Sequence, residues 1–366
     1  MEEALGHFKN GEIDIAETLF SKAIDIYPDY FQAIYNVGII KFMKNNFSEA
    51  ENYIEKAFFL NSSDKYFSSV IDVYLSQKKI QKAENFLKDW ENKINKEIII
   101  SNKNKITHQI EFQLIVDEYN SYNNNFTDDF EKKVASFSKK FPQNYVAWKL
   151  LGNILYQKKD TKDENFFNNL IKIFEKSYTL NNKDIDVILK LGSLYSENNF
   201  SKKAIGLYSI SKKILPNEHL LYFNCGNTFA KIGDIELAKD EYKKSIKMNP
   251  DHYYSYQNLA KAYKDLNEIN KSEETYIKMI KLDNKNASGY RGLGAIRLLK
   301  SELIDAKEML LKSINLDPNN NDAKQNLSIC YLRLGETEKG VDCAKDNLGV
   351  LSFPIDKKYG KFKIIQ

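Results

Sequence analysis

The sequence predicts an all-α protein that folds as a right-handed superhelical solenoid of about ten helical hairpins. The main observation is a period of 34 residues that three separate sets of small residues or prolines share. These sets are Gly192, Gly226, Ala260, Gly294 and Ser328; Ala204, Ala238, Ser272, Ala306 and Gly340; and Pro216, Pro250 and Pro318, with Asn284 at the vacant place. A fixed period in this range is typical of stacked supersecondary units that contact only their neighbours.

Within each period the apolar residues mark two helices. In residues 219–252 they recur twice at helical spacing, first as Tyr222, Cys225, Gly226 and Phe229 and then as Ala238, Tyr242 and Ser245. We expect Gly233 and Asp234 to form the turn between the two helices, and Pro250 to end the second one. In this interpretation Gly226 and Ala238 are small because the two helices of the hairpin cross there.

The same pattern divides the chain into blocks. Residues 1–97 predict about three N-terminal repeats, and residues 145–349 predict a C-terminal array of about six, whose first repeat carries an inserted loop at 158–167. Residues 98–144 keep a second-helix pattern but lack the small crossing residue, so we interpret them as a degenerate repeat or junction. The tail, 350–366, is rich in aromatic and β-branched residues, which favours one or two strands or the start of a further domain.

The composition argues against several classes of function. Lys and Arg number 54 and Asp and Glu number 50, and the resulting net charge of +4 is too small for a dedicated nucleic-acid binder. No window approaches the roughly 20 apolar residues of a membrane span, and no signal peptide is visible, so we expect a cytoplasmic protein without membrane partners. Cys225, Cys330 and Cys343 lack metal or disulfide spacing, and Cys225 stands where other repeats have leucine, as a small core residue.

No catalytic group is evident in the sequence. The four histidines, His7, His108, His219 and His252, form no metal-ligand spacing with one another or with Cys and carboxylates. We expect His219 and His252 to be exposed, at equivalent edges of two repeats. The segment Gly289–Gly294 falls inside a predicted first helix, where its glycines serve packing rather than phosphate binding. The sequence thus predicts a protein that is not an enzyme and has no cofactor or metal site.

This repeat resembles the tetratricopeptide repeat family. The 34-residue length, the aromatic-x-x-Leu-Gly-x-x-Tyr first helix, the Ala-x-x-x-Tyr second helix and the closing proline all match, in five copies that share one register. The resemblance implies a superhelix in which the first helix of each hairpin lines the concave surface. It also implies that the protein works by holding another protein.

One position on the predicted concave face is rich in asparagine. It stands just before the Leu, Val or Cys of each first helix and is occupied by Asn36, Lys190, Asn224, Asn258, Gly292 and Asn326. This series resembles the asparagine ladder in the repeat region of O-linked N-acetylglucosamine transferase, where the amides bind the main chain of a peptide. An amide carries both donors and an acceptor, so it can pair with an extended chain of any sequence. The alternative is that Asn-Leu-Gly is simply common in this repeat family.

Other residues of the predicted concave face complete the candidate site. Lys149 and Asn153, one turn apart, resemble half of the carboxylate clamp by which some repeat modules hold a peptide C-terminus, although the later repeats do not complete it. Phe223 and Tyr254 fall at concave positions too, either as interface aromatics or as packing. The predicted peptide-binding residues are Lys149, Asn153, Lys190, Asn224, Asn227, Asn258, Lys261, Arg291 and Asn326.

We therefore expect a non-enzymatic adaptor or scaffold that holds an extended peptide or a partner helix along its concave face. A second hypothesis is that the chain is the substrate-recruiting repeat region of a larger transferase, similar to a glycosyltransferase, or of another modifying enzyme. A third hypothesis is self-association through the tail. The sequence does not name the protein partner.

Overall fold

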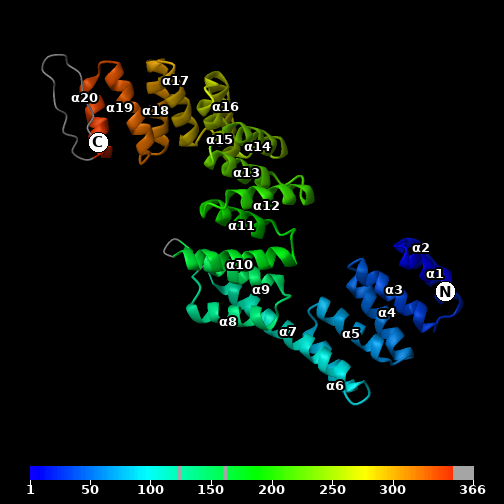
Figure 1. Cartoon of the computed structure of the whole chain (residues 1–366). Coiled ribbons are helices and arrows are strands. Elements are labelled where there is room, and N and C mark those ends of the chain that lie inside the picture. Colours follow the sequence, from blue (N-terminus) through cyan, green and yellow to red (C-terminus); the bar gives the residue numbers. More distant parts are fainter. Residues whose placement is uncertain (123–124, 160–162, 349–366) are drawn as a thin grey trace. The chain divides into compact units, whose positions relative to one another are not determined.

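The computed structural model describes residues 1–122, 125–159 and 163–348, the last four of them as backbone only. In these residues the chain forms twenty helices and no strand, so the predicted all-α fold is confirmed (Figure 1). Within each of the two compact units that the next paragraph describes, helices that are adjacent in sequence pack together. The first helices of successive hairpins from α11 to α19 also touch, which is the contact pattern of a solenoid. The strands predicted for 350–366 lie outside the described residues.

The chain divides into two compact units, residues 1–157 and the residues from 158 onward. The helices of unit 1 are α1 (Glu2–Lys9), α2 (Ile13–Ile26), α3 (Phe31–Met43), α4 (Phe47–Leu60), α5 (Asp64–Ser76), α6 (Ile80–Trp90), α7 (Lys96–Ser121), α8 (Asp128–Lys140) and α9 (Tyr145–Tyr156). The helices of unit 2 are α10 (Glu164–Leu180), α11 (Ile185–Glu197), α12 (Ser201–Ile214), α13 (His219–Lys231), α14 (Ile235–Met248), α15 (Tyr253–Asp265), α16 (Ile269–Leu282), α17 (Ala287–Leu299), α18 (Leu303–Leu316), α19 (Asn321–Arg333) and α20 (Thr337–Leu348).

The structure corrects the extent of the predicted inserted loop at 158–167. Helix α10 begins at Glu164, where the carboxylate of Asp163 accepts a hydrogen bond from the backbone N–H of Phe166 at 2.9 Å. A carboxylate at this place caps the helix and favours an early start. Residues 164–167 are therefore helical and lengthen α10 to 17 residues. The repeat boundaries 1–97, 98–144 and 145–349 stay a prediction, and the compact division falls after Gln157.

Helix α7 departs most from the repeat pattern. It has 26 residues, and it occupies a large part of the segment that we interpret as a degenerate repeat. Its start is fixed by Asn95, whose side-chain oxygen accepts from the N–H of Glu97 at 2.8 Å. Its apolar residues do not gather on one stripe, so the sequence period does not mark where this helix ends.

The turns inside the regular hairpins share one backbone conformation. Five of them place a residue with φ between 60° and 85° at a constant period: Asn199, Gly233, Asn267, Ser301 and Gly335. The next residue donates its N–H to a carbonyl five residues earlier, as from Phe200 to Tyr195 at 2.7 Å and from Asp234 to Phe229 at 2.9 Å. This is the Schellman ending of a helix. The predicted turn at Gly233 is confirmed.

The small residues of the first helices make room for a side chain of the second helix. A Cβ atom on Gly226 would lie 2.6 Å from the ring of Tyr242, and one on Gly192 would lie 2.3 Å from the ring of Tyr208. The predicted need for a small residue is confirmed. Position 226 must be small because the ring of Tyr242, four residues after Ala238, fills the space there, and not only because the two helix backbones approach each other.

Tyr276 is placed differently from the tyrosines at the equivalent position. The small position of its own hairpin holds Ala260, and the ring of Tyr276 lies against Gly292 in α17, where a Cβ atom would come within 2.2 Å of it. Gly292 is the residue that interrupts the asparagine series. The interruption therefore has a packing cause, because the ring fills the space that a side chain there would need.

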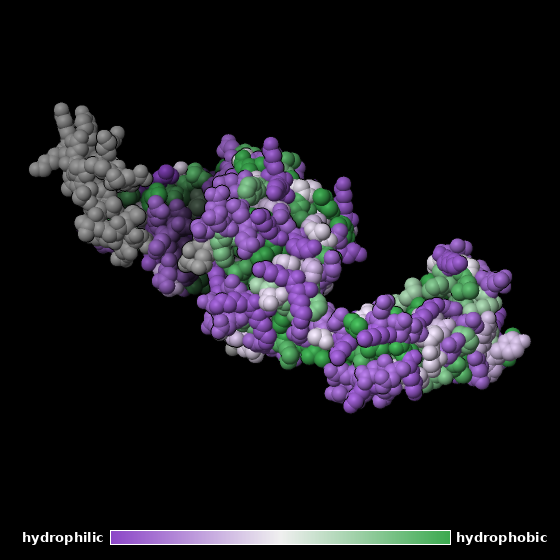
Figure 2. All heavy atoms as spheres, turned by 60° about the horizontal axis from the view of Figure 1, so that its bottom comes forward, coloured by the Kyte–Doolittle hydropathy of each residue, from purple (hydrophilic) through white to green (hydrophobic). Residues whose placement is uncertain are grey.

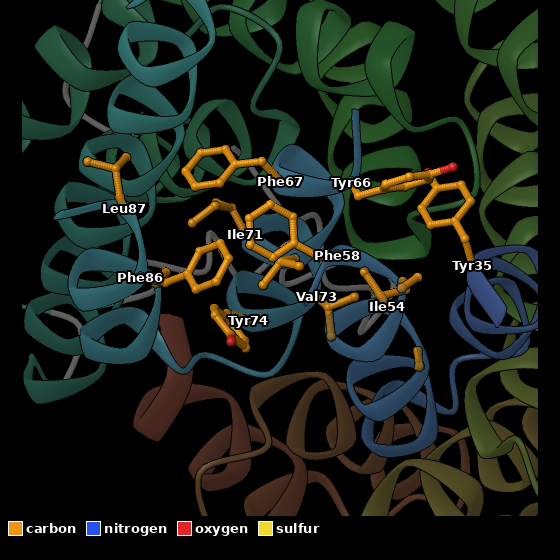
Figure 3. Packing of buried hydrophobic residues seen from close by; sticks show 14 of the residues in the cluster. Tyr35, Ile54, Phe58, Tyr66, Phe67, Ile71, Val73, Tyr74, Phe86 and Leu87 are labelled. Carbon is orange, nitrogen blue, oxygen red and sulfur yellow. The ribbon is translucent and has the colours of Figure 1, made fainter. Parts of the chain in front are cut away.

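Unit 1 contains an aromatic core, which Figure 3 shows from close by. Phe58 is fully buried, and the rings of Phe86 and Trp90 lie edge-on to it at centroid distances of 5.2 and 4.7 Å. Phe67 stacks on Phe86 at 5.2 Å. Aromatic pairs in these geometries stabilise a core beyond the area that they bury. Helices α4 to α6 are held together in this way.

Hydrophilic side chains cover much of the face that Figure 2 shows, with hydrophobic ones between them. Among the described residues, no helix combines the length and the apolar character that a bilayer span needs. Some apolar side chains of unit 2 are nevertheless well exposed, such as Leu299 at 60% and Ile329 at 38%. These two residues border a groove of that unit that we describe below.

Candidate functional site: the grooves between first helices

The first helices of unit 2 border a groove of about 590 Å³, which we call the α15–α19 groove. Helices α15, α17 and α19 supply its walls, and the ring of Tyr276 from α16 reaches it between them. Its lining residues are Gln257, Asn258, Lys261, Lys264, Tyr276, Arg291, Gly292, Ala295, Ile296, Leu298, Leu299, Asp322, Gln325, Asn326, Ile329 and Arg333. The groove thus crosses three successive repeats.

A smaller groove of about 240 Å³, which we call the α13–α15 groove, adjoins the first. Asn258 and Lys261 belong to both. The other lining residues are Asn227, Ala230, Ile235, Tyr242, Ala262 and Asp265. Together the two grooves form one surface along four successive first helices, α13, α15, α17 and α19.

The lining residues occupy equivalent positions on successive first helices. On each helix the set contains the member of the asparagine series, the residue just before it, and the residues three and seven positions after it. These positions lie on one face of a helix. On α15 they are Gln257, Asn258, Lys261 and Asp265; on α17 they are Arg291, Gly292, Ala295 and Leu299; on α19 they are Gln325, Asn326, Ile329 and Arg333. We call these sets the α15, α17 and α19 columns. The α15 column is polar throughout, whereas the α17 column is apolar beyond Arg291.

Two amides and a phenol form a hydrogen-bonded network where the grooves meet. The oxygen Oδ1 of Asn227 accepts from Tyr242 Oη at 3.0 Å and from Asn258 Nδ2 at 2.8 Å. Burial raises the pKa of Tyr242, so its hydroxyl stays protonated and donates. The network fixes the orientation of both amides. It leaves Asn227 Nδ2 as a donor and Asn258 Oδ1 as an acceptor for a further ligand.

Cations outnumber carboxylates along the grooves. The four cations are Lys261, Lys264, Arg291 and Arg333, and the two carboxylates are Asp265 and Asp322. Arg291 is ion-paired with Asp322, and Lys264 Nζ lies 3.7 Å from Asp265 Oδ1. Arg333 donates through Nη1 to the carbonyl of Leu298 at 3.2 Å, and Lys261 has no partner among the residues that the structure describes. The uncompensated charge is therefore positive and lies on Lys261 and Arg333.

Five of the nine predicted peptide-binding residues line these grooves: Asn227, Asn258, Lys261, Arg291 and Asn326. They come from four helices, and the repeat places them on one surface. Peptide binding by these five residues stays a prediction, because the geometry shows only that they line the same two grooves.

The other four predicted residues lie outside both linings. Lys190 Nζ is 2.8 Å from the carboxylate of Asp186, one turn away on α11. The Nδ2 of Asn224 donates to the carbonyl of Leu220 in its own helix at 3.0 Å. Lys149 and Asn153, both partly buried, lie on α9 in unit 1.

The sequence prediction did not include some residues of the groove lining, notably Tyr276, Leu299, Ile329 and Arg333. A signal for three of them was present, because they stand three or seven residues after a member of the asparagine series. Tyr276 carries no such signal, since it comes from a second helix. Its place depends on the absence of a side chain at Gly292.

The expectation that His219 and His252 are exposed is wrong. Both are partly buried, and their ring centroids lie 4.7 Å apart. The ring of His252 also packs against Phe223 at 4.9 Å, and its Nδ1 lies 2.7 Å from Ser255 Oγ. Stacking of successive repeats brings the two equivalent edges into contact. Phe223 therefore packs inside the array, whereas Tyr254 is 61% exposed.

Cys225 is buried as expected of a small core residue, and burial raises the pKa of its thiol. Gly289 and Gly294 lie inside α17, where added side chains would meet Ile280 and Leu310, so their packing role is confirmed. Within the described part of the chain, no group of three or more His, Cys, Asp or Glu side chains gathers in a way that could hold a metal ion.

Two family models, both described as the tetratricopeptide repeat, match residues 220–252 and 241–274. Residues 220–274 therefore match the tetratricopeptide repeat. Together the two matched segments extend from α13 into α16, and they include Asn224, Asn227, Asn258 and Lys261. No curated protein matches the chain.

Several solved structures of repeat proteins are similar to the chain. YrrB, described as a TPR protein with an unusual peptide-binding site, is 18% identical over 48% of this chain and 92% of its own, with a TM-score of 0.40. MamA is 23% identical over 43% of this chain and 92% of its own, with a TM-score of 0.40. Yeast Tom70 is 12% identical over 94% of this chain and 90% of its own, with a TM-score of 0.44.

Proposed function

We propose that the protein is a non-enzymatic scaffold whose unit 2 holds an extended segment of a partner protein in the α13–α15 and α15–α19 grooves. The amides of Asn227, Asn258 and Asn326 pair with the main chain of that segment, and Lys261 and Arg291 contact its side chains. A cytoplasmic location stays a prediction from the composition. The larger-enzyme hypothesis has no support from the residues that the structure describes.

The observation that carries the proposal is the gathering of amides at equivalent positions of α15 and α19 on one groove. Asn258 is held by Asn227 at 2.8 Å, so its acceptor is oriented without a ligand, which lowers the entropy cost of binding. Amides can pair with both peptide N–H and C=O groups, whereas a partner helix has already paired its own. An extended segment therefore fits this lining better than a helix does.

The proposal is tested with a library of random peptides displayed on phage and selected on the full chain. The affinity of an enriched peptide is then measured by fluorescence anisotropy. Replacing both amides, in the variant Asn258→Ala/Asn326→Ala, removes two or more hydrogen bonds to the main chain. We expect a loss of about fivefold to a hundredfold in affinity, since each such bond contributes roughly 0.5–1.5 kcal/mol.

The matched control is Asn270→Ala, which removes an exposed amide on α16, outside both linings. It should leave the affinity unchanged, and circular dichroism should show the same helix content in all variants. Enriched peptides that bind the double variant as tightly as the natural chain would rule out the grooves as the binding site.

A further inference from the structure

The columns of the α15–α19 groove differ in chemistry, and this difference specifies a ligand. We propose that the groove selects extended segments in which one aliphatic residue is flanked on both sides by acidic residues. This inference rests on the proposed peptide binding and adds the chemical class of the partner to it.

The centre of the groove is suited to an aliphatic side chain. In the α17 column, Gly292 and Ala295 offer no polar side-chain atom, and Leu299 is 60% exposed. Ile329, 38% exposed, extends this surface on α19. An aliphatic side chain bound here would remove its own surface and theirs from water, which favours binding. A polar side chain would lose hydration and gain no partner there.

The two ends of the groove are suited to carboxylates. Lys261 on α15 has no partner among the described residues, and Arg333 on α19 donates only to a carbonyl, so either can take a carboxylate without losing an ion pair. Arg291 already holds Asp322. A basic segment would meet an excess of like charge, which disfavours its binding. The groove therefore discriminates by the sign of the charge on the partner.

The spacing of the helices sets the spacing of the ligand residues. Helix α17 contacts both α15 and α19, and packed helices lie about 8–10 Å apart. An extended chain rises about 3.3 Å per residue, so one helix spacing corresponds to roughly three residues. We expect an acidic residue about three positions before the aliphatic residue and another about three positions after it.

The test is the composition of peptides that the full chain enriches from the random library. We expect Asp and Glu to be enriched on both sides of Leu, Ile or Val. The variant Lys261→Glu/Arg333→Glu should bind an enriched peptide at least about tenfold more weakly at low salt, and the difference should shrink as salt screens the charges. It should gain affinity for the same peptide with Lys in place of its acidic residues.

The variant Leu299→Asp tests the apolar centre and should weaken binding of the same peptide. The controls make the same change of charge or polarity at exposed side chains outside the groove lining, as Lys213→Glu/Lys278→Glu and Ile304→Asp, and should bind as the natural chain does. Enriched peptides without acidic residues that still depend on Asn258 and Asn326 would overturn this inference and leave the proposed function intact. Enriched peptides that no groove variant affects would overturn both.

Discussion

At the scale of single residues, the pair formed by Tyr276 and Gly292 decides the shape of the groove. The ring lies where a side chain at position 292 would be, so the asparagine series is broken at the centre of the groove. The α17 column is therefore apolar beyond Arg291, and it lies between the polar α15 column and the α19 column, which is polar except for Ile329. A single glycine thus contributes to the chemical character of the binding surface.

We predict that Gly292→Ala destabilises the protein by about 1–3 kcal/mol, because the added Cβ would overlap the Tyr276 ring. The change is measured by urea unfolding followed by circular dichroism. The control is Gly206→Ala on α12, where no atom lies within 4 Å of the added Cβ. That control should stabilise by roughly 0.5–1 kcal/mol, as alanine favours helix. Equal stability of Gly292→Ala and the natural chain would contradict this packing.

The histidines make the stability depend on pH. Burial lowers the pKa of His108, and burial and the neighbouring His219 lower the pKa of His252, both from the ordinary value of 6.5. The unfolded chain therefore takes up protons at a higher pH than the folded chain does. Stability should be fully present above pH 6.5 and should fall as the pH decreases through the folded pKa values.

The measurement for this prediction is the free energy of unfolding at several pH values between 7.5 and 5.5. The variant His252→Gln removes the contribution of one titrating ring, so its stability should fall less steeply as the pH decreases. Equal slopes for the variant and the natural chain would contradict the lowered pKa of His252 and thus its burial in the folded chain.

At the scale of elements, the hairpin turn is the most regular feature of unit 2. Positive φ recurs at a constant period, yet glycine occupies only some of these places, and Ser301 has φ of 63°. A residue with a Cβ pays a steric penalty in this conformation that glycine does not. We predict that Ser301→Gly stabilises the protein by about 1 kcal/mol in urea unfolding. A destabilised variant would contradict the turn geometry.

Much of each hairpin could be predicted from sequence, because a small residue, a turn residue and a ring recur at fixed spacing. Helix α7 could not, since its apolar residues form no single stripe. Nor could the start of α10, which depends on capping by Asp163 within a segment that reads as a polar loop. The repeat pattern predicts the helices where the packing itself repeats, and it does not predict helix boundaries where the packing is irregular.

At the scale of the whole molecule, the period places site residues but does not say which of them face a groove. Asn258 and Asn224 occupy the same position, yet Asn224 bonds to its own helix whereas Asn258 bonds to Asn227 across to α13. Lys190 is held by Asp186. These differences arise from side-chain rotamers and from neighbouring hydrogen-bond or ion-pair partners. A comparison of equivalent positions in the repeat sequences does not show them. The candidate binding surface is therefore smaller than the predicted one and lies along the first helices α13, α15, α17 and α19.

Site-specific photo-crosslinking to an enriched peptide tests the central claim most directly. A photoreactive phenylalanine analogue is placed at Gln325, which lines the α15–α19 groove and is exposed, or at the exposed Ile304 on α18 outside the lining. We predict that the peptide crosslinks to the Gln325 position and that excess unlabelled peptide competes. Crosslinking at position 304 with none at position 325 would contradict the claim that the groove between first helices holds the partner.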